Sequence, residues 1–209
     1  MRGKKVKQLR AQTARKEAAV IAGLSQWWDG HKDDYTYAAC ILVARITTDV
    51  LTHFKIPHRV VPVKVNAMNQ QRFDRISNLA DGDDGMEFRD GEYSVGANDG
   101  SLNERGFGGH LIIVTSNDCV VDLTNYQFDR PEHDIVTGDS VRVSKVAGIF
   151  HDFVVGKEVR LQLDSGMLLY WAIDTDIYRD SPDWRLSRQL SQEAIDAISN
   201  ALAMKKANA

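Results

Sequence analysis

The chain has 209 residues, of which 43% are hydrophobic and 26% are charged, and its formal charge is −3. A chain of this length buries roughly 70% of its unfolded surface, so the composition predicts one folded domain and excludes extensive disorder. The apolar runs are shorter than the ~18 residues of a membrane-spanning helix. Because the basic start also lacks the apolar core of a secretory signal, we expect a cytoplasmic protein without membrane contact.

The charges are distributed unevenly along the chain. Residues 1–16 contain seven Lys and Arg and no acid, so all 29 acidic residues lie in the rest of the chain. Residues 6–28 are rich in Ala and Leu and contain no Pro, which predicts a helix. We therefore expect a basic helical arm over 1–25, followed by a single domain over 26–209. Residues 2–16 are suited to an anionic partner or nucleic acid, and the simpler alternative is a solvated helix start.

A second helix is predicted over residues 37–54, after the break at DGHKDDYT. Asp34 or Thr36 is placed to cap this helix, because both residue types accept hydrogen bonds from the first turn. This prediction locates Cys40 within the first two turns of the helix.

The rest of the chain is typical of antiparallel strands. Val61–Val65 alternates as a strand does, and Pro62, which cannot donate a ladder hydrogen bond, predicts an edge or bulged position. A short helix is predicted within 67–77, and the Gly- and Asp-rich stretch 78–109 has room for one short hairpin. Further short strands are predicted at 110–114, 119–123, 141–146, 158–163 and 167–173. With a last helix from about Ser191, the pattern predicts an α+β fold.

Three residues form a candidate catalytic group: Cys40, His110 and Asp122. The start of a helix presents unpaired N–H groups and the positive end of the dipole, which together lower the pKa of a thiol. A histidine takes the thiol proton, and a carboxylate on the other ring nitrogen fixes the tautomer and orientation of the imidazole. His110 and Asp122 can supply these two roles.

Hairpin geometry predicts that the last two of these residues are neighbours. If the turn TSND is centred on Ser116, His110 lies directly opposite Asp122 on the adjacent strand, with about 5 Å between the Cβ atoms. The same register pairs Cys119 with Ile113 on the other face.

The motifs around this group resemble a known family. A cysteine at a helix start, the strand FKIPHRVVPVKV, and then GGHLIIV and VVDLT are similar to the transglutaminase-like branch of the papain-type cysteine fold. The resemblance spans residues 30–135 and implies N-terminal helices packed on an antiparallel sheet. It also implies that Cys40 is the nucleophile, His110 the base and Asp122 the orienting acid, in the family's order.

The resemblance implies a cysteine-dependent acyl-transfer enzyme, a hydrolase or a transferase, that acts on a peptide or another amide or ester and needs no cofactor. Tyr37, Gly109, Asn125 and Gln127 are the weaker candidates for substrate binding, because they lie beside the group in the sequence. No papain-like Gln precedes the cysteine. Tyr37 and the more distant Gln26 are therefore the candidates for the second oxyanion donor.

Two other functions remain open. Cysteine, histidine and aspartate are also zinc ligands, although no fourth ligand follows at a recognisable spacing, so we expect no metal. The chain is alternatively a non-catalytic binding module of the same fold, which uses its basic arm on nucleic acid or a protein partner. A lone Cys on an amphipathic helix is more often a small buried apolar residue than a nucleophile.

Overall fold

The computed structural model describes residues 2–35, 39–79, 87–103, 106–138 and 142–207. The α-helices are α1 (Arg2–Asp29), α2 (Cys40–His53), α3 (Gln70–Ser77), α4 (Ile149–Asp152), α5 (Pro182–Leu186) and α6 (Arg188–Ala207). The strands are β1 (His58–Met68), β2 (Ser94–Ala97), β3 (Leu102–Asn103), β4 (Gly106–Phe107), β5 (His110–Thr115), β6 (Cys119–Asp122), β7 (Arg142–Lys145), β8 (Glu158–Gln162) and β9 (Met167–Ala172).

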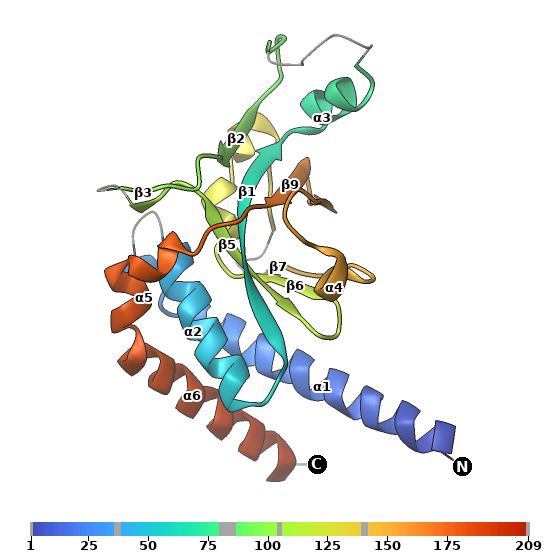
Figure 1. Cartoon of the computed structure of the whole chain (residues 1–209), viewed down its shortest axis with the longest axis vertical. Helices are drawn as coiled ribbons and strands as arrows, with labels where there is room; N and C mark the ends of the chain where they lie inside the picture. Colours follow the sequence, from blue (N-terminus) through green and yellow to red (C-terminus); the bar gives the residue numbers. More distant parts are fainter. Residues whose placement is uncertain (1, 36–38, 80–86, 104–105, 139–141, 208–209) are drawn as a thin grey trace.

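Seven of these strands form one antiparallel sheet that nearly closes on itself (Figure 1). The strand order is β7-β6-β5-β1-β9-β8, and β2 also pairs with β1. The strands β3 and β4 form a separate two-stranded sheet. The predicted α+β class is confirmed at this level.

The long strand β1 is the centre of the sheet and not an edge. Its first half pairs with β5 and its second half with both β9 and β2. The edge position predicted from Pro62 is therefore wrong. The carbonyl of Pro62 accepts from the N–H of Ile173, just beyond the last β1–β9 pair, Val63 with Ala172. The N–H that Pro62 lacks would point toward β9, as its carbonyl does. Its absence therefore removes a hydrogen bond only at the end of the β1–β9 ladder.

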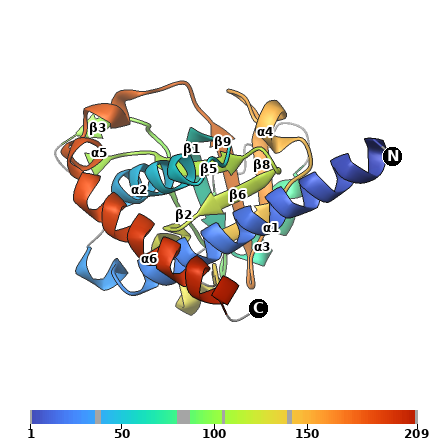
Figure 2. The same ribbon diagram turned by 90° about the horizontal axis from the view of Figure 1, so that it is seen from below.

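Alternate residues of the strands face two different cores. Leu111, Ile113 and Val121 face the helices α1, α2 and α6, which together form the outer core. Ile112, Val114 and their neighbours on the other strands face the inside of the curved sheet and form the inner core. Figures 1 and 2 show the three helices on one side of the sheet, with α2 lying directly against β1 and β5.

Helix α1 joins the basic arm to the body without a break. It crosses the expected boundary after residue 25, and it buries Val20, Ile21 and Leu24 in the outer core. Its N-terminal half extends away from the body in both views (Figures 1 and 2). No helix of the described residues is long and apolar enough to cross a membrane.

The starts of α2 and α3 differ from the predicted ones. Helix α2 begins at Cys40 after Ala39, which has no side chain to cap it, and the expected cap Asp34 lies in an earlier 3-10 turn, η1 (Lys32–Asp34). The other expected cap, Thr36, lies outside the described residues. Helix α3 is shorter than predicted because β1 continues to Met68.

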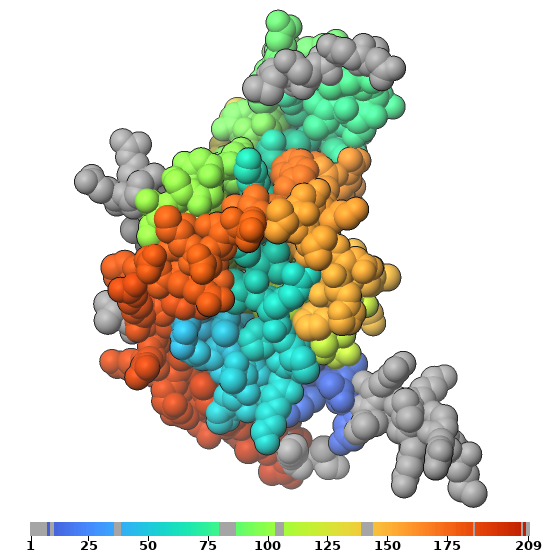
Figure 3. All heavy atoms as spheres, in the orientation of Figure 1, coloured from blue at the N-terminus to red at the C-terminus, as the bar shows by residue number. Residues whose placement is uncertain are grey.

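Helix α3 lies at one end of the molecule (Figures 1 and 3). A buried carboxylate holds it to the segment before β2. Glu92 accepts from the guanidinium groups of Arg72 and Arg75, at 3.0 Å and 2.5 Å. This cluster is far from α1 and α6, and it fixes the segment that leads into β2.

A second buried carboxylate, Glu17, fastens α1 to the β5–β6 hairpin. Glu17 is 2% exposed and accepts from the Thr115 hydroxyl and the Asn117 amide. Replacing it with alanine leaves both donors without their acceptor, and a lost buried partner costs about 1–3 kcal/mol.

We expect Glu17→Ala to lower the free energy of unfolding by about 2–3 kcal/mol, measured by urea denaturation. Glu193→Ala on the exposed surface of α6 is the matched control and should change it by less than about 0.5 kcal/mol. Equal stability of the two variants would show that Glu17 does not fasten the helix.

Candidate active site

Cys40 is the first residue of α2 and is 3% exposed, within the outer core. Ala39 before it makes no side-chain cap, and the first backbone hydrogen bond of the helix runs from Val43 N to Ala39 O. The N–H groups of Cys40 and the next two residues therefore have no acceptor within the helix. These groups form the positive end of the helix dipole at the residue that carries the thiol.

The β5–β6 hairpin brings His110 and Asp122 together in a register that differs from the predicted one. Ile113 pairs with Val121 and Val114 with Val120, so the predicted pairing of Ile113 with Cys119 is wrong. The turn is centred one residue later than expected, because Asp118 takes a left-handed conformation with φ of 63°. His110 is consequently a diagonal neighbour of Asp122 on the inner face, and not the residue directly opposite it.

The diagonal placement still permits a direct hydrogen bond. His110 Nε2 lies 2.8 Å from Asp122 Oδ2, and the two side chains are 1% and 0% exposed. The backbone N–H of Thr124 donates to the other oxygen, Oδ1, over 3.0 Å. The ring of Phe128 packs edge-on against the His110 ring, with 5.1 Å between centroids. The pair is thus shielded from water and its orientation is fixed.

Cys40 also interacts with His110. The Cys40 side chain is one of the groups, after Asp122, that raise the pKa of His110. Because Nε2 is bound to Asp122, Nδ1 is the ring nitrogen left for the thiol. Histidine therefore connects the residue at the helix start with the carboxylate inside the sheet.

The two buried groups hold each other in their charged forms. Burial opposes the imidazolium of His110, but the charge and hydrogen bond of Asp122, with Cys40, outweigh it and raise the pKa of His110. Burial likewise opposes the carboxylate of Asp122. The charge and hydrogen bond of His110, followed by hydrogen bonds from Tyr170 and Thr124, lower the pKa of Asp122.

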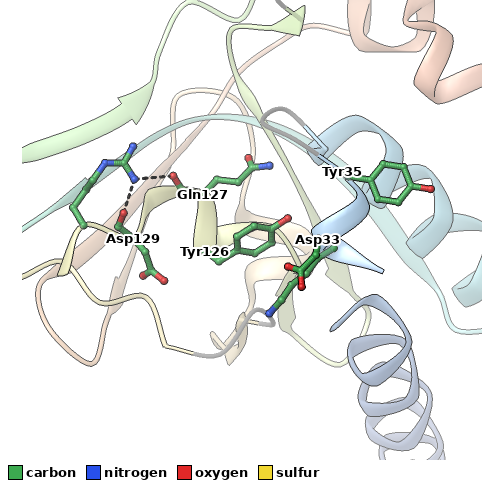
Figure 4. Close-up of a pocket in the computed structure, with 7 residues that line it drawn as sticks. Asp33, Tyr35, Tyr126, Gln127 and Asp129 are labelled. Carbon is green, nitrogen blue, oxygen red and sulfur yellow. Dashed lines mark hydrogen bonds between the residues drawn. The ribbon is translucent and has the colours of Figure 1, made fainter. Parts of the chain in front are cut away.

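A surface hollow of about 410 Å³ lies between the segments that flank the site (Figure 4). One wall comes from the residues just before α2 and the other from the residues just after Asp122. Burial raises the pKa of the Tyr126 hydroxyl, and the charges of Asp33 and Asp122 add to this rise. The lining residues are Lys32, Asp33, Tyr35, Tyr126, Gln127, Asp129 and Arg130.

One of the described weaker substrate candidates lines this hollow. Gln127 lines it, whereas Gly109 and Asn125 are buried. A Cβ atom at Gly109 would lie 2.8 Å from the Phe107 ring, so this glycine permits close packing beneath the site. The Asn125 side-chain oxygen is buried and has no hydrogen-bond partner among the described residues. Tyr37 lies outside the described residues.

The sequence interpretation missed Tyr170 on β9. Its hydroxyl donates to Asp122 Oδ2 over 2.5 Å, and its ring is fully buried. The apolar stretch MLLYWAI reads as a core strand, and alternation places Tyr170 on one face of it. Nothing in that pattern indicates a partner 48 residues earlier in the chain.

Comparisons of the chain with protein-family models, curated proteins and solved structures found no match. Within the part of the chain that the structure describes, no group of three or more His, Cys, Asp and Glu side chains is arranged to hold a metal ion.

The raised pKa of His110 leads to a direct prediction. We expect the His110 ring to remain protonated at pH 7.5 in the native protein, in ¹⁵N NMR spectra of the imidazoles. In Asp122→Asn the burial penalty remains while the carboxylate charge is lost, so the ring should be neutral at the same pH.

The other histidines provide the internal control, because their signals should not move between the two proteins. A His110 ring that is neutral in the native protein at pH 7.5 would contradict the ion pair.

Proposed function

We propose that this chain is a cysteine-dependent acyl-transfer enzyme that works through a thioester on Cys40. The observation that carries the proposal is the connection of one buried histidine to both the thiol at a helix start and a buried carboxylate. Nucleophilic cysteine catalysis requires this combination, because only the thiolate attacks and the base must keep a fixed orientation.

In the first half of the reaction, the Cys40 sulfur attacks the carbonyl carbon of an amide or ester. In the resting site the proton of the thiol already lies on His110, and Asp122 stabilises this imidazolium. The N–H groups at the start of α2 are the donors for the negative oxygen of the tetrahedral intermediate. When the intermediate collapses, His110 returns the proton to the leaving amine or alcohol, and the acyl group stays on sulfur.

In the second half, water or an amine attacks the thioester carbonyl while His110 removes its proton. Sulfur leaves as the thiolate, and the product is an acid or a new amide. The substrate binds in the hollow lined by Tyr35, Tyr126 and Gln127, because this hollow lies between the segments that carry the nucleophile and the acid. We infer a peptide, or another amide or ester, as the substrate class.

The architecture is compatible with a transglutaminase-like form of the papain-type fold, which we propose as the finer description of the α+β class. Three features support it: the cysteine starts a helix, that helix packs on the strand carrying the histidine, and the acid lies on the next strand.

The non-catalytic binding module is the second candidate. The observation that favours it is the N-terminal half of α1, which extends from the body and carries the seven Lys and Arg of residues 1–16 (Figure 2). Binding of nucleic acid through this arm would weaken steeply with salt.

The acyl-enzyme provides the decisive test. Incubation with p-nitrophenyl acetate should place one acetyl group on Cys40, removable by neutral hydroxylamine, as measured by mass spectrometry of the intact protein and its peptides. Cys40→Ala should not form it, and His110→Ala should slow its formation by about 10²- to 10⁴-fold.

Cys119→Ser is the matched control and should be acylated at the native rate, because burial, followed by the charge of Glu17, raises the pKa of the Cys119 thiol. Acylation of Cys119 in preference to Cys40, or equal p-nitrophenol release by native protein and Cys40→Ala, would overturn the proposal.

A further inference from the structure

We propose that Tyr170 is a positioning residue of the Cys40–His110–Asp122 group, where its hydroxyl fixes the carboxylate that orients the histidine. This inference rests on the proposed function, and it adds a fourth member that lies on a different part of the sheet. Tyr170 does not touch the reacting atoms; it acts through Asp122.

The geometry separates Tyr170 from an ordinary core tyrosine. Its hydroxyl donates over 2.5 Å to Asp122 Oδ2, the same oxygen that lies 2.8 Å from His110 Nε2. The rings of Tyr170 and His110 are nearly parallel, with 4° between their planes and 6.3 Å between centroids. Such short O–H···O⁻ bonds are typical of a charged acceptor.

Together with Thr124, the tyrosine prevents the carboxylate from rotating. The backbone N–H and the hydroxyl of Thr124 both donate to Oδ1, so each oxygen of Asp122 has two donors. Rotation about the Cβ–Cγ bond would break all four interactions at once. Without the Tyr170 hydroxyl, Oδ2 keeps only its contact with the histidine, and the orientation of the imidazole is less restricted.

The hydroxyl also helps to keep the carboxylate ionised. A hydrogen bond to the charged form of an acid lowers its pKa, and Tyr170 is one of the groups that do so for Asp122. When the hydroxyl is removed, Asp122 takes up a proton at higher pH. The imidazolium then loses its counter-charge at that pH, and the thiolate of Cys40 loses its partner.

The experiment compares Tyr170→Phe with the native protein by the rate of Cys40 alkylation with iodoacetamide from pH 3 to pH 9. The acid limb of the profile should move up by roughly one pH unit, since a hydrogen bond to a charged group is worth about that much. Phenylalanine keeps the ring and its packing, so a purely structural role predicts no shift.

Tyr178→Phe is the matched control. Tyr178 is 2% exposed, and its hydroxyl interacts with Arg179 rather than with Asp122. Its profile should coincide with that of the native protein. Incorporation of 3-fluorotyrosine at position 170 alone makes the hydroxyl a stronger donor and should move the acid limb to lower pH, which tests the idea even if Tyr170→Phe does not fold.

The outcomes separate the two proposals. If Asp122→Asn moves the acid limb and neither substitution at position 170 does, the Tyr170 assignment is overturned and the proposed function stands. If native Cys40 is no more reactive than free cysteine, the proposed function fails. Tyr170 is then judged by ¹³C NMR of the Asp122 carboxyl: titration at higher pH in Tyr170→Phe supports the assignment, and an unchanged titration overturns it.

Discussion

The buried charge of Asp122 is the constraint on which the rest of this structure depends. An ionised carboxylate removed from water costs several kcal/mol unless charged or polar partners replace the lost hydration. Here the partners come from three places: the preceding strand gives His110, the following turn gives Thr124, and β9 gives Tyr170. These segments must meet at one point inside the sheet. The sheet therefore curves until β9 and β6, which are separated by β1 and β5 in the strand order, face each other.

The two cores position different parts of the site. The inner core surrounds Asp122 with apolar residues, which keeps the ion pair dry and strong. The outer core packs α2 against β1 and β5. Cys40, the first residue of α2, is thereby brought toward His110, the first residue of β5. The histidine is bonded through Nε2 to the carboxylate and also interacts with Cys40, which belongs to the outer core. Fastening of α1 to the same hairpin through Glu17 restricts the hairpin from its other end.

Local sequence signals were sufficient to predict most helices and strands, but not how these elements pair and pack. A helix with Cys40 in its first two turns and a hairpin that carries His110 and Asp122 could be predicted, because apolar alternation and turn residues are local. The register could not, since the left-handed conformation of Asp118 moves the turn by one residue and every pairing by two. The placement of β1 at the centre was missed because Pro62 interrupts only the end of a ladder. Tyr170 was missed because its partner is set by closure of the sheet, a property of the whole fold.

In the proposed function, the hollow binds the substrate outside both cores. Its lining residues lie in two short segments, one just before the helix that carries the thiol and one just after the strand that carries the acid. Exposed and half-buried residues in such segments accept substitution at little cost in stability, whereas Asp122 and Tyr170 do not. In the enzyme that we propose, changes in Tyr126 or Gln127 would therefore alter which substrate reaches Cys40, while the buried network is unchanged. In this arrangement, substrate preference could change independently of the reaction that we propose for the site.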